Sequence, residues 1–421
     1  MAPRMGNSVL VVEDSRAIAS LLHSRITDLP DVCCELAEDM AGATQLLEQG
    51  AERFFVAVLD LNLPDAPNGG VVDLVQSYGI PVIILTGSMD TEKREKLFAR
   101  NIADYIEKNQ LAGVWSAVAL VERIRANREH AVLVVDDSAS QRAYLCSLLH
   151  NHGYQTVEAA DGEQGLDMLQ SHNEIRVVIT DYNMPKMDGL QMVREMRKHR
   201  SPQDLAIIGI SSLSQKGILA RFLKNGANDF LQRPFELEEL YCRIDQNLDM
   251  IRYIHQAWDA ANRDFLTHLY NRRYFFEHAE KIHASAREGK YEIVVAMIDA
   301  DHFKKINDKH GHDVGDAALV EIASTLQTMG EGRGIIARFG GEEFVCIRIL
   351  KSGEEPERCM QELCSAIEAI DLKAPDGSRV PLTVSIGATR DLNDSLSGML
   401  RSADEAVYQA KEQGRNRVVV V

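Results

Sequence analysis

Short, continuous apolar runs alternate with longer stretches of helical periodicity in the N-terminal half of the chain. The runs at residues 9–12, 56–59 and 82–85 contain only valine, isoleucine, leucine and alanine. Runs of this length without polar alternation are typical of strands buried on both faces, and helices between such strands form the crossovers of a parallel sheet. The pattern therefore predicts a doubly wound α/β fold.

The pattern is repeated within the chain. The sequence VLVVEDS from residue 9 returns as VLVVDDS from residue 132, and strands that end in a carboxylate recur at residues 56–60 and 177–181. The two copies are separated by about the length of one domain. We therefore expect two similar domains, at residues 6–127 and 130–248.

After Pro234 a long stretch keeps helical periodicity into the C-terminal region. Residues recur every seven positions, as in helices that pair with each other. The two series are Leu237, Ile244, Ile251 and Trp258, and Leu240, Asn247, Ile254 and Ala261. The first half either packs on the sheet of the second domain as its last helix or begins the paired helix. Residues 249–262 have no obvious core to cover, so we expect a helical linker that pairs with a second copy.

A pair of glycines lies between two apolar runs near the C-terminus. Residues 335–337 and 344–347 flank the sequence RFGGEEF, in which Gly340 and Gly341 favour a tight hairpin turn because glycine enters positive φ at little cost. Glu342 and Glu343 follow. Taken alone, they are either solvent-facing acids on an ordinary hairpin or a metal ligand and a proton acceptor.

Residues with complementary chemistry lie on both sides of this hairpin in the sequence. The apolar run 293–298 ends in Asp299. A carboxylate at a strand end, beside a helix N-terminus, can hold a divalent cation while free backbone amides receive phosphate. Lys411 and Arg415 are four residues apart, so on a helix they would share one face.

These blocks resemble the GGDEF diguanylate cyclases. The matching blocks are residues 264–267 with 271–273, residues 299–316, the GGEEF hairpin and residues 411–417, and the resemblance covers about residues 263–421. It implies an α+β domain similar to the nucleotidyl cyclase and palm folds, which joins two GTP molecules into cyclic di-GMP and releases two pyrophosphates. Because each 3′-hydroxyl attacks the α-phosphate of the other GTP, the resemblance implies a homodimer.

The resemblance also implies the roles of the catalytic residues. Asp299, Glu342 and the carbonyl of Ala300 would bind Mg²⁺, or Mn²⁺ in its place. Glu343 would contact or deprotonate the 3′-hydroxyl, or bind metal instead. Asn307 and Asp316 would read guanine. The β and γ phosphates would be held by side chains and amides of His302, Phe303, Lys304, Lys411 and Arg415.

The two N-terminal copies resemble the flavodoxin-like receiver domains of two-component response regulators. In the first copy, Glu13, Asp14 and Asp60 would meet at the carboxyl ends of the strands, where a divalent cation keeps crowded carboxylates ionised. The resemblance implies that Asp60 accepts a phosphoryl group from a sensor histidine kinase or a phosphotransfer protein, with Glu13 and Asp14 as Mg²⁺ ligands. It further implies that Thr86 and Lys108 contact the phosphoryl oxygens and that Tyr105 is the aromatic residue of the switch.

The second copy departs from this set at one position. It keeps Asp136, Asp137, Asp181 and Ser211, which implies a second acidic metal pocket with Asp181 as a further candidate for phosphorylation. Arg233, however, stands in the place of Lys108, and the planar guanidinium is not interchangeable with a lysine point charge. We therefore hypothesise that the second receiver is mainly an adaptor that is phosphorylated poorly.

Two departures from the cyclase pattern concern regulation and packing. Many family members carry an Arg-x-x-Asp product-binding motif before the hairpin, whereas residues 331–334 here read EGRG. We expect that cyclic di-GMP does not inhibit through that site. His268 stands where the family usually has glycine, which bears on the packing or the linker geometry there and leaves the catalytic set untouched.

Composition limits the other functions. The formal charge of −17 argues against general nucleic-acid binding, which requires neutralisation of phosphates. No apolar run is long enough to span a bilayer, residues 1–8 do not resemble a secretory signal, and the seven cysteines lack metal-ligand spacing. We therefore expect a cytoplasmic protein without membrane insertion.

The whole chain resembles response regulators of the PleD type: two receivers, a helical connection and a cyclase domain at residues 263–421. The resemblance implies a cyclase that is activated by phosphorylation of Asp60 and by dimerisation. The alternative is a signalling module that binds GTP or a partner without turnover. A DNA-binding response regulator is disfavoured because no basic recognition helix follows the receivers.

Overall fold

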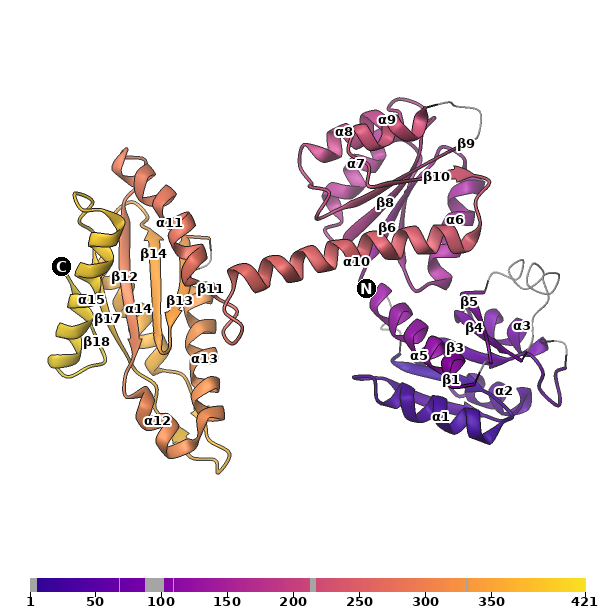
Figure 1. The fold of residues 1–421 in the computed structure, drawn as a ribbon, viewed down its shortest axis with the longest axis horizontal. Helices are drawn as coiled ribbons and strands as arrows, with labels where there is room; N and C mark the ends of the chain where they lie inside the picture. Colours follow the sequence, from indigo (N-terminus) through magenta and orange to yellow (C-terminus); the bar gives the residue numbers. More distant parts are fainter. Residues whose placement is uncertain (1–5, 68, 88–101, 109, 213–216, 331) are drawn as a thin grey trace. The chain divides into compact units, whose positions relative to one another are not determined.

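The structure is a computed structural model that describes residues 6–67, 69–87, 102–108, 110–212, 217–330 and 332–421. Two compact units divide the chain, Met1–Ile254 and His255–Val421 (Figure 1). The first unit contains both N-terminal sheet domains, and the second contains the domain with the GGEEF hairpin.

The first apolar runs form a five-stranded parallel sheet in the order β2-β1-β3-β4-β5. Its strands are β1 (Ser8–Val12), β2 (Cys33–Ala37), β3 (Phe54–Asp60), β4 (Val82–Thr86) and β5 (Asp104–Glu107). Its described helices are α1 (Arg16–Thr27), α2 (Met40–Glu48), α3 (Gly70–Ser77) and α5 (Gln110–Asn127), with a 3₁₀ turn η1 (Ala51–Arg53). Apolar clusters cover both faces of the sheet, which explains the continuous apolar runs.

The second copy repeats this arrangement, in the order β10-β9-β8-β6-β7. The strands are β6 (Ala131–Val135), β7 (Gln155–Ala159), β8 (Ile175–Asp181), β9 (Ala206–Ser212) and β10 (Asp229–Arg233). The described helices that follow them are α6 (Ala139–Asn151), α7 (Gly162–Ser171), α8 (Gly189–Arg197) and α9 (Ile218–Lys224). The prediction of two doubly wound parallel sheets is confirmed.

The predicted long helix is α10 (Leu237–Asn262). Its first half is the last helix of the second sheet domain, because Leu240, Tyr241 and Ile244 are buried in that domain's core. Ile251 is buried there too, at 6% exposure. The expectation that residues 249–262 lack a core was therefore wrong for Ile251, since the helix runs one turn further along its own domain.

His152 connects the two sheet domains inside the first unit. Its Nε2 donates a hydrogen bond to the carbonyl of Ala103 at 2.7 Å, and its own carbonyl accepts one from Asn127 Nδ2 at 2.8 Å. The ring stacks on Tyr241, with 3.4 Å between the ring centroids. Burial lowers the pKa of His152 to about 4, so the ring is neutral near pH 7.

The C-terminal domain is built on a six-stranded mixed sheet in the order β11-β13-β14-β12-β17-β18. Its strands are β11 (Tyr270–Asn271), β12 (Ile293–Ala300), β13 (Gly334–Gly340), β14 (Glu343–Ile349), β17 (Val384–Thr389) and β18 (Arg417–Val420). A separate small hairpin consists of β15 (Leu372–Lys373) and β16 (Arg379–Val380). The predicted α+β class is confirmed.

Helices cover both faces of this sheet. One cluster of core residues joins the sheet to α12 (Phe303–His310), α13 (His312–Gly330) and α14 (Pro356–Glu368). The other joins it to α11 (Arg272–Arg287) and α15 (Leu396–Glu412). The layers place the carboxyl end of β12 beside the N-terminus of α12.

The last turns of α10 belong to the second unit and are attached to it by aromatic residues. The Trp258 ring meets Tyr270 and Tyr274 edge-on, with centroids 6.3 and 5.8 Å away. Those two tyrosines stack at 3.8 Å, and the Arg263 guanidinium lies over Tyr270. Trp258 therefore packs against aromatic side chains of its own chain, and this packing does not require a second copy.

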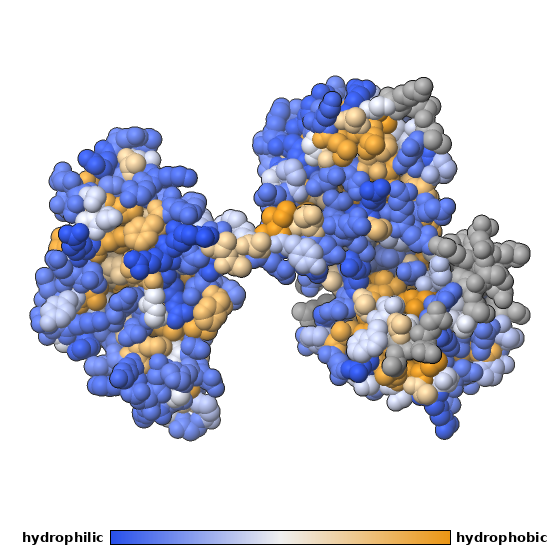
Figure 2. Space-filling view, in the orientation of Figure 1, coloured by the Kyte–Doolittle hydropathy of each residue, from blue (hydrophilic) through white to orange (hydrophobic). Residues whose placement is uncertain are grey.

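The surface accords with the acidic, charged composition. Figure 2 shows hydrophilic residues over most of the face in view on both units, as expected for a chain with 26% charged residues. Of the helices that the structure describes, none combines the length and apolarity needed to cross a bilayer.

Candidate functional site

The acidic residues of the first receiver-like domain converge as the sequence predicts. Glu13 and Asp14 directly follow β1, and Asp60 ends the neighbouring strand β3. One carboxylate oxygen from each lies within 4.8 Å of the others. These oxygens can therefore share one divalent cation.

Lys108, which follows β5, lies against two of these carboxylates, Glu13 and Asp60. Its Nζ is 2.7 Å from Glu13 Oε2 and 2.7 Å from Asp60 Oδ2. Burial raises the pKa of Glu13, and the hydrogen bond and charge of Lys108 oppose this rise. For Lys108 itself, burial acts against the charged form, but the hydrogen bonds to Asp60 and Glu13 raise its pKa. The lysine is thus held ionised at the acidic site.

The two other predicted switch residues lie on neighbouring strands. Thr86 ends β4 and is buried, while Tyr105 in β5 is half-buried and packs against the apolar core. Pairing of β4 with β5 places Ile84 opposite Tyr105 and Thr86 opposite Glu107.

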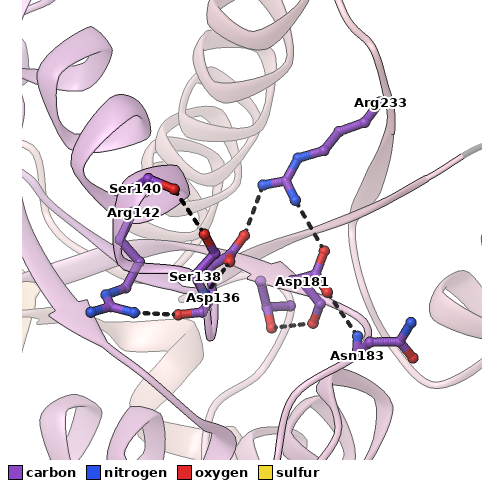
Figure 3. Close-up of polar contacts among 8 residues, drawn as sticks. Asp136, Ser138, Ser140, Arg142, Asp181, Asn183 and Arg233 are labelled. Atoms are coloured by element: carbon purple, nitrogen blue, oxygen red, sulfur yellow. Dashed lines mark hydrogen bonds and ion pairs between the residues drawn. The ribbon is translucent and has the colours of Figure 1, made fainter.

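The second receiver-like domain has an arginine fork at the equivalent place (Figure 3). Arg233 Nη2 lies 2.8 Å from Asp136 Oδ2, and Nη1 lies 3.2 Å from Asp181 Oδ1. The remaining oxygens accept backbone hydrogen bonds, from Ser138 to Asp136 and from Asn183 to Asp181. Burial raises the pKa of Asp181, and the neighbouring charge of Asp136 adds to this effect while Arg233 opposes it.

The rest of the second predicted set is more dispersed. Asp137 is exposed and Ser211 is buried in β9. Within the described ranges, the trio of the first domain is the sole group of three acidic, histidine or cysteine ligands spaced closely enough for one ion. The structure therefore brings Asp136, Asp181 and Arg233 together, without gathering a metal-binding trio.

The GGEEF hairpin forms, but its turn is shifted from the predicted one. β13 extends through Gly340, so the two connecting residues are Gly341 and Glu342. The pairing slips between Arg338 and Gly340, which adds a residue to β13, and Gly341 takes the positive φ of +53°. Glu342 thus lies in the turn itself, whereas Glu343 is the first residue of β14.

An ion pair fixes the base of the hairpin. Arg338 donates to the carbonyl of Gly341 at 2.7 Å and lies 2.9 Å from Asp264 Oδ1. The same Asp264 oxygen accepts hydrogen bonds from the backbone amide and hydroxyl of Thr267. The two separated sequence blocks therefore meet in one network.

Asp299 and Glu343 lie side by side on the sheet. They are direct partners in the antiparallel pairing of β12 with β14, so their side chains leave the same face. Lys411 of α15 approaches that face, with Nζ 2.7 Å from Asp299 Oδ2. A cleft of about 130 Å³ opens there, lined by Met297, Ile298, Asp299, Glu343, Asp404, Val407, Tyr408 and Lys411.

The electrostatics of this cleft favour a bound cation. Burial raises the pKa of Asp299, against the opposing contribution of Lys411. Burial also raises the pKa of Glu343, and the negative charges of Asp299 and Asp404 add to it. Asp404 is a cleft residue to which the sequence analysis gave no role; its position on the same helix as Lys411, seven residues earlier, was the available signal.

The predicted guanine-reading residues lie where two helices meet. Asn307 is on α12, and Asp316 is exposed on the first turns of α13. Asn307 Oδ1 is buried and has no hydrogen-bond partner among the residues that the structure describes. A Cβ atom on Gly315 would lie only 1.8 Å from that oxygen, so the glycine leaves room for the amide.

The predicted phosphate-binding residues surround the start of α12 and the end of α15. His302 caps α12 with φ +57°, Phe303 packs its ring against the core, and Lys304 is exposed. Arg415 also has a positive φ, +65°, and its guanidinium donates to the carbonyl of Lys411.

Asp301 was also missed by the sequence analysis. It is buried and accepts hydrogen bonds from Thr383, Ser385 and the backbone amide of Asn416. It thereby attaches the segment after α15 to the sheet. The one sign of Asp301 in the sequence is its place two residues after Asp299, at the end of the apolar run.

The two departures have clear structural settings. Arg333 pairs with Glu354 at 3.3 Å, while Glu331 lies outside the described residues, so the expected lack of product inhibition stays a prediction. His268 has φ +56°, a conformation that glycine adopts more easily, and its amide donates to the carbonyl of Asp264.

Comparison with family models assigns all three domains. Residues 9–116 and 132–245 match the response regulator receiver domain, and residues 261–417 match the diguanylate cyclase GGDEF domain. The chain belongs to the response regulator family. Its output domain is a GGDEF diguanylate cyclase domain, and cyclases of this family depend on a metal ion.

Individual relatives match the whole chain or a part of it. The response regulator PleD of Caulobacter vibrioides (strain NA1000 / CB15N) is 26% identical over 460 aligned positions, which cover 99% of each chain. Diguanylate cyclase TpbB of Pseudomonas aeruginosa (strain PAO1) is 34% identical over 211 positions, covering 49% of this response regulator and 44% of TpbB. A solved two-component response regulator/GGDEF domain protein is 39% identical, with a TM-score of 0.52, and covers 58% of this chain and 99% of its own.

Proposed function

We propose that this response regulator makes cyclic di-GMP when a phosphoryl group on Asp60 brings two of its cyclase domains face to face. Each GTP 3′-oxygen forms a bond to the α-phosphorus of the other GTP. Two pyrophosphates leave with the electron pairs of the broken bonds, and the two 3′-hydroxyl protons are released. One cleft holds one GTP, so the homodimer supplies the second half-site.

The observation that carries this proposal is the pairing of Asp299 with Glu343 beside Lys411. Two carboxylates with raised pKa values, and a lysine 2.7 Å from one of them, Asp299, suit a ligand that brings both a divalent cation and phosphates. The hard oxygen donors of Asp299, Glu342 and the Ala300 carbonyl would hold Mg²⁺, or Mn²⁺, which offsets charge on the departing pyrophosphate. Glu343 is positioned to accept the 3′-hydroxyl proton, or to bind metal instead.

The unpartnered amide oxygen of Asn307 supports a base-binding role. A buried acceptor without a donor costs about 1–3 kcal/mol, so a bound guanine N–H would stabilise it. Asp316 would accept further guanine N–H bonds. The phosphates would contact the amides of residues 302–304 and the side chains of Lys304, Lys411 and Arg415.

The first receiver supplies the switch in this proposal. Phosphorylation of Asp60 by a sensor histidine kinase or phosphotransfer protein would draw Lys108 and Thr86 to the new phosphoryl oxygens, and Tyr105 would follow. Mg²⁺ bound by Glu13, Asp14 and Asp60 would accompany the transfer. The second receiver acts as an adaptor. Because GTP and such kinases meet in the cytoplasm, we place the protein there.

Turnover of GTP by the purified full chain tests the catalytic part. With Mg²⁺ present, mass spectrometry of the products should identify cyclic di-GMP. Glu343→Gln should lower kcat by about 10²-fold or more, since general base catalysis contributes roughly 10²–10⁴-fold. The matched control is Glu405→Gln, which removes an exposed carboxylate of α15 outside the cleft. GTP binding without any product would instead support the non-catalytic module.

A further inference from the structure

The turn that follows α15 has an unusual backbone. Gly414, Arg415 and Asn416 all have positive φ, of +116°, +65° and +47°. Residues with a Cβ adopt such φ values rarely, so the conformations of Arg415 and Asn416 need support from their surroundings. The turn joins the helix that carries Lys411 to β18. Arg415, which is expected to bind the GTP phosphates, is therefore held in a conformation that its own sequence does not favour.

Asp301, directly after β12, supplies support for this turn. Its Oδ2 accepts a hydrogen bond from the backbone amide of Asn416 at 3.0 Å. The Thr383 hydroxyl donates to the same oxygen at 2.9 Å, and the Ser385 hydroxyl donates to Oδ1 at 2.7 Å. Asp301 is 5% exposed and Ser385 is fully buried, so water competes little for these bonds. Two hydroxyls at the start of β17 thus fix the carboxylate that binds the turn.

The other hydrogen bonds of the turn are local or weak. The Arg415 amide donates to the carbonyl of Ala410, which belongs to the end of the same helix. The Cys364 thiol, a weak donor, lies 3.5 Å from Asn416 Oδ1. Pairing of β18 with β17 begins only at Arg417. Because hydrogen bonds to a charged group are stronger than neutral ones, Asp301 is the main restraint on the Asn416 amide.

The same strand end carries the proposed metal ligands. The pairing of β12 places Asp299 between Glu343 of β14 and Ser385 of β17. Ser385 is therefore both the strand neighbour of Asp299 and a hydrogen-bond donor to Asp301. Through these contacts, the turn that carries Arg415 has a defined position relative to the carboxylates of the cleft. Such a fixed arrangement lowers the cost of orienting a bound triphosphate.

We propose that Asp301 is a positioning residue for GTP, because it holds the Asn416 amide and thereby sets the turn from which Arg415 reaches the β and γ phosphates. Asp301 itself contacts neither the nucleotide nor the metal ion. Its removal lets the turn relax from positive φ, and the Arg415 guanidinium then leaves the phosphate subsite. This inference rests on the proposed binding of GTP in the cleft, and it identifies the residue that prepares the phosphate subsite.

Nucleotide binding by the full-length chain tests this proposal without turnover. The probe is 3′-deoxy-GTP with Mg²⁺, since it lacks the attacking hydroxyl, and calorimetry gives its Kd. Asp301→Ala should raise this Kd by about 10-fold or more, the loss expected when a charge-assisted hydrogen bond to phosphate is no longer made. Asp301→Asn should restore most of the affinity, because an amide keeps an acceptor for the Asn416 N–H and can donate to Ser385.

Double variants separate positioning from general damage to the domain. Adding Asp301→Ala to Arg415→Ala should cause no further loss, whereas adding it to Asn307→Ala should multiply the two losses. Ser385→Ala removes one of the three donors and is the milder variant if Asp301→Ala unfolds; it should raise the Kd less, with the same dependence on Arg415. The matched control is Glu354→Ala, which removes a carboxylate that pairs with Arg333 and Arg348 near the opposite end of β14 from Glu343, and it should leave the Kd unchanged.

Three results would overturn the proposal: an unchanged Kd in Asp301→Ala with thermal unfolding intact, losses that multiply fully in the Arg415 double variant, or an Asp301→Asn variant that binds as weakly as Asp301→Ala. Failure of the unaltered chain to bind 3′-deoxy-GTP would instead overturn the proposed function, and this inference with it.

Discussion

Gly315 on α13 provides a sensitive test of guanine recognition. In Gly315→Ala the new Cβ would lie 1.8 Å from Asn307 Oδ1 and 2.9 Å from its Cγ. An ordinary contact begins near 3.4 Å, so the amide oxygen must retreat by about 1.6 Å. The far end of a side chain can make that movement, but the oxygen then leaves the place where it would accept a guanine N–H.

The expected loss is therefore specific to substrate binding. Removing one hydrogen bond to a buried acceptor costs about 1–3 kcal/mol, which corresponds to roughly a 5- to 150-fold rise in the KM for GTP. The fold should tolerate the change, because alanine is favoured over glycine within a helix by about 0.5–1 kcal/mol. Thermal unfolding and steady-state kinetics on the same preparation separate the two effects.

Two control variants test whether Gly315→Ala acts through Asn307. Gly70→Ala in α3 adds a Cβ that meets nothing closer than 3.8 Å, so KM should not change. Adding Gly315→Ala to Asn307→Ala should cause no further loss, because both act through one amide. An unchanged KM in Gly315→Ala with the fold intact, or fully additive losses in the double variant, would refute the role assigned to Asn307.

Three further predictions follow from backbone strain and from charge. His268→Gly should stabilise the cyclase domain by about 1 kcal/mol in urea unfolding, since a non-glycine residue at φ +56° costs about 1–2 kcal/mol; no gain would mean that its ring compensates. Lys411→Met removes the cation that lowers the pKa of Asp299, so the acid limb of the turnover–pH profile should move to higher pH; an unmoved limb would exclude Asp299 as its origin. Burial depresses the pKa of His152 from 6.5 to about 4, so its stabilising contribution is complete above pH 6.5 and is lost as the pH falls toward 4. The receiver unit should thus lose up to about 3 kcal/mol of unfolding free energy over that window, and His152→Gln should flatten this dependence.

The sequence was sufficient to predict the buried strands and the carboxylates at their ends. Buried parallel strands require continuous apolar runs. The carboxyl ends of β1 and β3 then lie at the same edge of the sheet, so Glu13, which follows β1, and Asp60, which ends β3, could be placed together. The same logic put Asp299 at the end of β12. The cyclase motifs supplied the other residues that the sequence predicted for the site, but not Asp404 or Asp301.

Features that depend on the register of strand pairing, or on packing between elements distant in the sequence, could not be predicted from the sequence pattern. The turn at Gly341 and Glu342 arises from a pairing slip after Arg338, which no local pattern announces. Asp404 reaches the cleft only because α15 packs across the sheet beside β12. Ile251 has a core to join because α10 extends past the expected end of its domain. Each depends on tertiary geometry that the spacing of residues does not encode.

The most direct test of the account measures GTP turnover with Mg²⁺ by the full-length protein, with and without beryllofluoride as a mimic of the Asp60 phosphoryl group, while light scattering records the oligomeric mass. We predict that cyclic di-GMP forms faster with the mimic, that the mass rises to that of a dimer, and that Asp60→Asn abolishes both responses. Equal rates in the two states would contradict the switch, and the absence of product in both, despite GTP binding, would contradict the assignment as an active cyclase.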